Sequence, residues 1–201
     1  QYVADVGAWR QRHVGLATDG EAFAFTLGGA VDPAMRPDLA GLPAAADGTL
    51  LERCPDAERL VAALAARLVA GGGAALIIDY GPARSGPGET LQAVRDHRPA
   101  DPLADPGEID LSHHVDFERL ANAAAEAGAR PWGPIPQGLF LGRLGIAERA
   151  AALSAAAPDD GAAIEGAIRR LVHPGRMGLL FKALAVSHPA LPAPPGFIAG
   201  G

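Results

Sequence analysis

The stretch RQRHVGLATDGEAFAFTL, residues 10–27, has a two-residue period on both sides of an Asp19-Gly20 pair. Larger side chains such as Val14 and Phe25 stand at every second position, which is typical of a β-strand. Because Asp-Gly is a favoured pair for a tight turn, the pattern predicts a β-hairpin. The next residues, 28–50, are rich in Gly, Pro and Ala and predict a loop with little structure of its own.

A helical pattern begins at Pro55, a residue suited to the first position of a helix. Asp56 and Glu58 follow, and acidic residues are stabilised at the positive end of the helix dipole. Three leucines then recur at every fourth position: Leu60, Leu64 and Leu68. The pattern predicts a helix that ends at Gly71 and buries these leucines.

Residues 74–80, AALIIDY, are apolar on both faces, as expected of an inner parallel strand that is covered by helices on each side. After this strand we expect a polar loop, and then a helix from Asp116, as its N-cap, to Gly128. The buried face of that helix is predicted to contain Phe117, Leu120 and Ala124. The order of helix, strand and loop indicates an α/β fold.

Shorter elements are predicted for the rest of the chain. Leu139 to Leu144, Ala147 to Ser154 and Ala163 to Val172 have helical patterns. Met177 to Val186 reads as a strand with Lys182 as its one charge, and the proline-rich tail, HPALPAPPGF, is expected to lie extended on the surface.

Composition narrows the class of protein. Of 201 residues, 49% are hydrophobic and 20% charged, and no apolar run approaches the ~18 residues of a membrane span, so we expect a globular protein. The net charge of -6 disfavours a nucleic-acid partner, because a phosphate backbone would be repelled. Cys54, the single cysteine, cannot form an internal disulfide, which favours a reducing compartment. The chain begins with Gln1 and not Met, so we expect its native amino terminus to lie upstream.

Two places carry candidate chemistry. Asp79 and Tyr80 end the predicted strand, where a carboxylate can reach a ligand while the sheet holds its backbone; the alternative is that Asp79 caps a turn and Tyr80 packs on the loop. The segment DLSHHVDF, residues 110–117, holds two histidines and two aspartates, which could bind zinc or supply a general base. Adjacent histidines rarely converge on one ion, so we favour a histidine hydrogen-bonded in a pocket wall, without a metal. Lys182 is expected to run along the sheet edge, with its ammonium group in water.

Several blocks of the sequence resemble the carboxyl-terminal half of the MidA family: ALIIDYG, the stretch from GETLQAV to HHVDFERLANAAAEAG, GPIPQGLFLGRLGI, MGLLFKALAV and PPGF. Members of this family are class I S-adenosylmethionine-dependent methyltransferases, and they include a mitochondrial arginine methyltransferase that assists respiratory complex I assembly. The resemblance implies a Rossmann-like α/β sheet with a β-hairpin insertion. In that sheet ALIIDY would be the fifth strand and MGLLFKALAV the antiparallel final strand.

The resemblance also implies how the chain is organised. Residues 1–201 would be the carboxyl-terminal part of one methyltransferase domain, with 1–50 as a hairpin and loop insertion and 51–201 as the later core. The S-adenosylmethionine site would lie mainly in the amino-terminal half of the family's fold, with no cofactor-binding residue in this chain. Carried over as pocket-wall positions are Asp79, Tyr80, His114, Asp116 and Gln137.

Two functions follow from the resemblance. The first is protein arginine methylation, with a substrate protein that could be a respiratory complex I subunit, in the bacterial cytoplasm or, for eukaryotic relatives, the mitochondrial matrix. The second is a non-catalytic assembly module that keeps the family's partner-binding surface.

Overall fold

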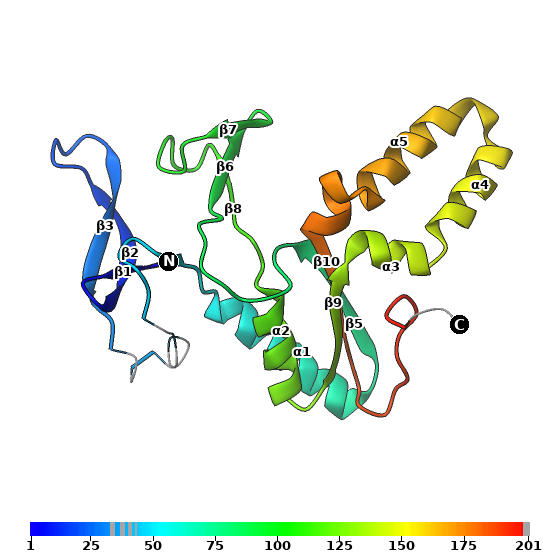
Figure 1. The fold of residues 1–201 in the computed structure, drawn as a ribbon, viewed down its shortest axis with the longest axis horizontal. Helices are drawn as coiled ribbons and strands as arrows, with labels where there is room; N and C mark the ends of the chain where they lie inside the picture. The colour runs from blue at the N-terminus through cyan, green and yellow to red at the C-terminus, as the bar shows by residue number, and fades with distance from the viewer. Residues whose placement is uncertain (33–34, 37–38, 40–41, 43, 199–201) are drawn as a thin grey trace. The chain divides into compact units, whose positions relative to one another are not determined.

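The computed structural model describes residues 1–32, 35–36, 39, 42 and 44–198 of the chain. The chain divides into two compact units (Figure 1). The first unit consists of Gln1–Pro55 and Gly86–His114, and the second of Asp56–Ser85 and Val115–Gly201. None of the helices in the described ranges is long and apolar enough to cross a membrane.

A four-stranded antiparallel sheet forms one part of the first unit. Its strands are β1 (Tyr2–Asp5), β2 (Ala8–Leu16), β3 (Phe23–Ala30) and β4 (Leu50–Leu51), in the order β3-β2-β1-β4. The predicted hairpin is therefore confirmed as β2 and β3. The predicted loop at 28–50 is wrong at both ends, where β3 runs to Ala30 and β4 begins at Leu50. Residues 33–34, 37–38, 40–41 and 43 of that loop lie outside the described residues.

The first unit also contains a sheet where a polar loop was predicted. Its strands are β6 (Gln92–Arg95), β7 (Arg98–Ala100) and β8 (Asp110–Ser112), in the order β7-β6-β8. Asp96 and His97 connect β6 to β7 with φ of 50° and 61°, and positive φ at both central residues is the requirement of a tight type I′ turn. Strands of three or four residues are too short to show a period in the sequence, which explains the missed prediction.

Helices and a third antiparallel sheet make up the second unit. The helices are α1 (Pro55–Gly71), α2 (Phe117–Glu126), α3 (Gln137–Arg143), α4 (Ile146–Ala156) and α5 (Gly161–Val172). The strands are β5 (Ala74–Tyr80), β9 (Arg130–Pro136) and β10 (Phe181–Ser187), in the order β5-β10-β9. In Figure 1, α1 and α2 lie beside this sheet, while α4 and α5 form a pair that extends from it.

The predictions for α1 and β5 need two corrections. Helix α1 begins and ends as expected, but Leu60 is 70% exposed, and the buried stripe contains Val61 and Ala65. Both stripes fit a helical period, so the sequence pattern alone does not distinguish them. Strand β5 is not an inner parallel strand within the described residues, because its partner there is the antiparallel β10. One face of β5 is open, with Leu76 51% and Ile78 42% exposed.

The main core lies between the sheet and the two helices α1 and α2. Phe117, Leu120 and Ala124 of α2 are buried against Leu184 and Val186 of β10. The predicted buried face of α2 is therefore confirmed, as are the three later helices.

Strands β9 and β10 differ from the prediction for physical reasons that are visible in the sequence. The strand predicted from Met177 begins only at Phe181, because Pro174–Gly178 form an irregular π-type turn. Strand β9 was not predicted, since its sequence RPWGPIP contains three prolines. It lies at the sheet edge, where prolines are tolerated because the N–H that proline lacks would point outward and would have no partner strand to bind. The tail ends in a turn that packs Phe197 on Phe140, with ring centroids 5.2 Å apart.

Candidate active site at the end of strand β5

Strand β5 ends with Asp79 and Tyr80, and the chain bends at Gly81. The Asp79 carboxylate accepts a hydrogen bond of 2.8 Å from the backbone N–H of Tyr80. The Tyr80 ring meets Phe181 of β10 edge to face, with centroids 5.5 Å apart. A carboxylate and a phenol are thus presented from a strand end whose backbone is held by the sheet.

The segment before α2 presses against this turn. The backbone N–H of Val115 donates to the carbonyl oxygen of Tyr80 at 3.0 Å. Gly81 is buried, and a Cβ added there would lie 2.0 Å from the carbonyl oxygen of Val115. Only glycine therefore allows this approach of the two backbones. Asp116 follows Val115 in the chain, so the last residues of the segment DLSHHVDF lie at the end of β5.

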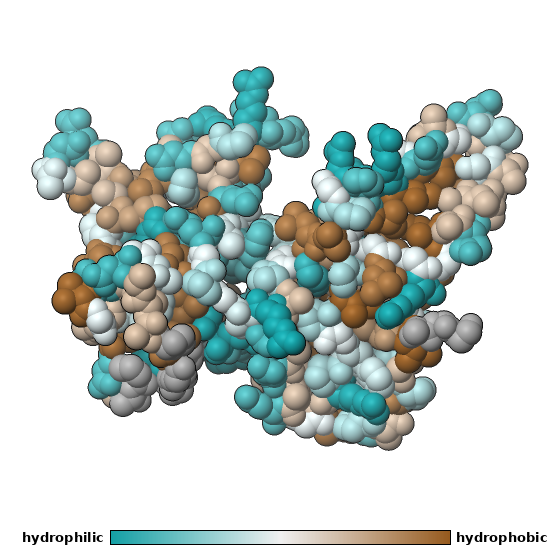
Figure 2. Space-filling view, in the orientation of Figure 1, coloured by the Kyte–Doolittle hydropathy of each residue, from teal (hydrophilic) through white to brown (hydrophobic). Residues whose placement is uncertain are grey.

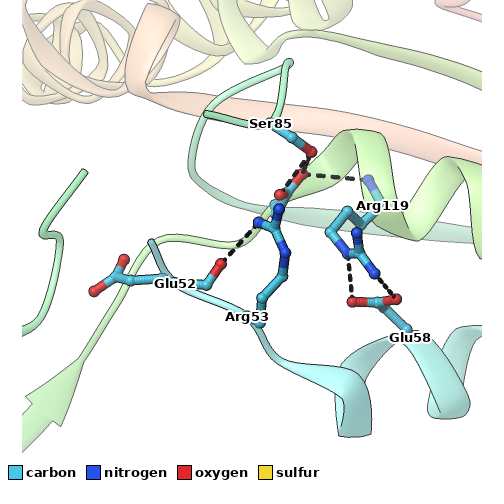
Figure 3. Close-up of polar contacts among 6 residues, drawn as sticks. Glu52, Arg53, Glu58, Ser85 and Arg119 are labelled. Carbon is cyan, nitrogen blue, oxygen red and sulfur yellow. Dashed lines mark hydrogen bonds and ion pairs between the residues drawn. The ribbon is translucent and has the colours of Figure 1, made fainter. Parts of the chain in front are cut away.

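Asp116 is the N-cap of α2, as predicted. Its carboxylate accepts hydrogen bonds from the Arg119 backbone N–H at 3.2 Å and from the Ser85 hydroxyl at 2.7 and 2.8 Å. The Arg119 side chain reaches Glu58 of α1 with two bonds of 2.6 and 2.8 Å (Figure 3). The start of α2 is therefore tied both to the loop after β5 and to α1.

Lys182 contradicts the prediction of an ammonium group in water. Its Nζ donates to the backbone carbonyls of Gly81 at 2.9 Å, Leu180 at 3.2 Å and Leu179. Burial lowers the pKa of this side chain. Lys182 also stands opposite Asp79 in the register of β10 and β5, so both residues lie on one face of the sheet. A single charge in an apolar strand was the sequence signal for this role.

Gln137 opens α3 at the same end of the sheet, immediately after Pro136, which pairs with Lys182. Its side chain is 4% exposed and donates to the Leu171 carbonyl oxygen of α5 at 2.9 Å. The structure thus gives Gln137 a bond that holds two helices together. Its place in a pocket wall stays a prediction.

His114 belongs to the first unit, apart from the other four predicted site residues. Its backbone N–H donates to the Thr90 hydroxyl at 2.9 Å, and His113 Nδ1 lies 2.9 Å from the His114 carbonyl oxygen. Within the described ranges, no three His, Cys, Asp or Glu side chains gather in a way that could hold a metal ion.

Glu52 was missed by the sequence analysis, because nothing near it suggested a role. It accepts hydrogen bonds from the Thr90 backbone N–H at 3.1 Å, from the Thr90 hydroxyl, and from the Gln1 side chain at 2.7 Å. Burial acts to raise its pKa, but these hydrogen bonds and the charge of His113 outweigh burial, and the pKa of Glu52 is lowered.

The second unit has the order β5-β10-β9 with an antiparallel final strand, and its polar groups gather beyond the end of β5. Two solved structures share this arrangement over 99% of the chain, with TM-scores of 0.86 and 0.85 and 29% identity. Both are proteins of Burkholderia thailandensis, and the second is described as a "likely methyl transferase" bound to S-adenosyl-homocysteine. The fold is therefore the α/β, Rossmann-like fold of these two proteins.

The sequence profile of the family described as "putative S-adenosyl-L-methionine-dependent methyltransferase" matches residues 1–135, and the chain belongs to this family. Similar curated relatives are the mitochondrial protein arginine methyltransferase NDUFAF7 homolog of Drosophila melanogaster, 38% identical, and its mouse counterpart, 35% identical. Each match covers 68% of this chain and 31% of the relative. The chain also spans 54% and 52% of the two solved chains.

Proposed function

We propose that this chain is the carboxyl-terminal part of an S-adenosylmethionine-dependent protein arginine methyltransferase. The observation that carries the proposal is its similarity, over 68% of its length, to relatives named protein arginine methyltransferase. The neighbouring structure with bound S-adenosyl-homocysteine, the product left after methyl transfer, supports the cofactor.

The open edge of β5 supports a further part of the proposal, that the cofactor-binding half of the fold joins the sheet there. Strand β5 has one partner strand among the described residues, and Leu76 and Ile78 are exposed beside the free edge. Gly71–Gly73 cannot serve as the cofactor loop, because they lie after a helix and before a strand, the reverse of the required order. We therefore assign no cofactor-holding role to the described residues.

The roles that we assign concern the methyl acceptor. Bound S-adenosylmethionine would supply the methyl group: a guanidinium nitrogen would bond to the methyl carbon as the bond from that carbon to sulfur breaks. S-adenosyl-homocysteine would leave, and the methylated nitrogen would lose one proton to water. Asp79 is suited to orient the guanidinium, because Oδ1 binds the Tyr80 N–H and Oδ2 has no hydrogen-bond donor within the described part of the chain. Tyr80, Asp116 and Gln137 of the second unit are proposed to complete the pocket wall.

Replacing Asp79 by asparagine tests the proposal. Asparagine keeps the size and the acceptor for the Tyr80 N–H but removes the charge, so folding should persist while methyl transfer falls by about 10²-fold or more. The protein, with every segment that its gene encodes, is incubated with labelled S-adenosylmethionine and a lysate from cells that lack the gene. Single-turnover rates and the melting temperature are measured, and methylarginine is identified by mass spectrometry.

Asp159→Asn, at an exposed position between α4 and α5, is the matched control and should leave the rate unchanged. An unchanged rate for Asp79→Asn would remove Asp79 from the site. If the wild-type protein forms no methylarginine, the enzymatic proposal fails and the non-catalytic assembly module becomes the better account.

A further inference from the structure

The first unit contains an apolar groove of about 250 Å³. It is lined by Val14 and Phe23 of the β2–β3 hairpin and by Leu103, Ile109 and Leu111 from the segment between β7 and β8 and from β8 itself. Val14, Phe23 and Leu111 are 57%, 45% and 57% exposed. Single exposed apolar residues are common on proteins, but several of them around one concavity mark a binding surface.

Acidic residues are frequent in the segment 101–111, which forms one wall of this groove. In the stretch DPLADPGEIDL, residues 101–111, every groove residue except Leu103 has an acidic neighbour in the chain. These acidic residues are all exposed: Asp101, Asp105, Glu108 and Asp110. Asp105 pairs with Arg95 at 2.6 Å, whereas Glu108 and Asp110 form no ion pair within the described ranges. Figure 2 shows hydrophilic side chains, in teal, at the tips of the β2–β3 and β6–β7 hairpins, beside apolar ones in brown and tan.

We propose that the groove binds a segment of the substrate protein in which an apolar side chain lies next to arginine or lysine residues. This inference rests on the proposed function, because a protein presented for arginine methylation brings positive charge to the enzyme. The apolar side chain enters the groove, and the neighbouring cations face Glu108 and Asp110. The volume suits this occupant, since pockets for small molecules usually measure about 300–1,000 Å³.

Charge also argues against a second copy of the chain as the occupant. In a symmetric dimer the same surface of both copies would meet, and this would place the two acidic segments 101–111 against each other. Like charges across an interface oppose association. A basic segment of another protein is favoured by the same acidic residues.

A peptide-binding experiment tests the proposed role of the groove without requiring catalysis. The probe is a dye-labelled peptide that alternates arginine with leucine, and its binding to the protein with every segment that its gene encodes is followed by fluorescence anisotropy. Two comparison peptides carry glutamate in place of arginine, or glycine in place of leucine. We expect the first peptide to bind more tightly than either comparison, and more weakly as salt is added, because salt screens exposed charges.

Three variants locate the binding. Leu111→Ser should weaken binding by about tenfold or more, because a buried leucine contact is lost. Glu108→Gln combined with Asp110→Asn should weaken it by about three- to tenfold and reduce its dependence on salt. Leu27→Ser is the control: this residue is also exposed on β3 but does not line the groove, so its variant should bind like the wild type.

Several results would overturn the proposal. These are equal binding of all three peptides, equal binding by all variants, no binding at millimolar peptide, or a dimer that Leu111→Ser dissociates in sedimentation. Methylation by the complete protein separates this proposal from the proposed function. If wild type and Leu111→Ser methylate substrate protein with the same KM, the groove does not bind the substrate, and the proposed enzymatic function remains supported. If no methylation occurs but the variants weaken peptide binding as predicted, the groove is a binding surface and the proposed enzymatic function is wrong.

Discussion

Replacing Asp116 by alanine is expected to lower the free energy of unfolding of the second unit by about 2–4 kcal/mol. The carboxylate caps α2 through the Arg119 N–H, and loss of a cap costs about 1 kcal/mol. Its charge at the helix N-terminus adds about 0.3–1 kcal/mol. The hydrogen bond from the Ser85 hydroxyl, made to a charged acceptor that is only partly buried, adds about 1–2 kcal/mol.

Asparagine at the same position separates these contributions. Because asparagine caps helices about as well as aspartate, Asp116→Asn should cost less than about 1 kcal/mol, mostly from lost charge. Ser85→Ala should cost about 1 kcal/mol in the wild type and less in the Asp116→Ala background, since the shared hydrogen bond is then already absent.

Urea denaturation followed by tryptophan fluorescence measures these differences. Trp132 lies on β9 in the second unit and Trp9 on β2 in the first, so a Trp9→Phe background reports the second unit alone. Comparable losses for alanine and asparagine would refute the capping argument, because asparagine retains the acceptor. A loss below about 0.5 kcal/mol for alanine would show that neither contact stabilises the unit.

Three further predictions concern single positions. Lys182→Met should speed hydrogen exchange of the Gly81 amide by about tenfold, measured by mass spectrometry, because it removes the cation that binds three backbone carbonyls. Lys182→Arg should restore part of the protection. Unchanged exchange in Lys182→Met would contradict this role. The pKa of Glu52 is lowered in the folded state, so the stability that its charge contributes is present above the unfolded pKa and is lost as pH falls through the lower folded pKa. Glu52→Gln should therefore reduce the loss of stability of the first unit below about pH 4.5, measured as melting temperature against pH. The same loss in wild type and variant would contradict this prediction. Gly81→Ala should cost about 3 kcal/mol or more in urea denaturation, since the new Cβ meets the Val115 carbonyl oxygen; a small loss would mean that the loop can move aside.

Three elements could be predicted from one or two residues in the sequence. The Asp19-Gly20 pair predicted the β2–β3 hairpin, Pro55 predicted the start of α1, and Asp116 predicted the cap of α2. Pro55 and Asp116 stand at the helix boundaries that they determine, whereas Asp19 and Gly20 lie inside the six-residue connection, 17–22, between β2 and β3. The sheet β7-β6-β8 and strand β9 lack such signals, because short strands and prolines leave no period to detect.

Contacts between distant residues account for what the sequence could not predict at the site. Lys182 and Gly81 are 101 residues apart, and Ser85 and Asp116 are 31 apart. Which leucine or valine of α1 faces the core depends on packing against residues of α2 and β10, since both stripes have helical spacing. Sequence pattern therefore located Asp79 at a strand end, but the side chains that fix this end come from tertiary folding.

The turn at the end of β5 is held almost entirely through backbone atoms. Val115 N–H donates to the Tyr80 carbonyl, Gly81 N–H donates to the Leu180 carbonyl at 3.1 Å, and the Lys182 ammonium group binds the Gly81 carbonyl. The Asp79 carboxylate adds one bond, from the Tyr80 N–H, and asparagine keeps an oxygen that can accept it, so Asp79→Asn removes the charge and leaves this segment in place. Changes of Gly81 or Lys182 do the opposite, because they move the turn while the carboxylate remains. If Asp79 orients the methyl acceptor, Asp79→Asn should lower the rate at an unchanged melting temperature, whereas Gly81→Ala should lower both.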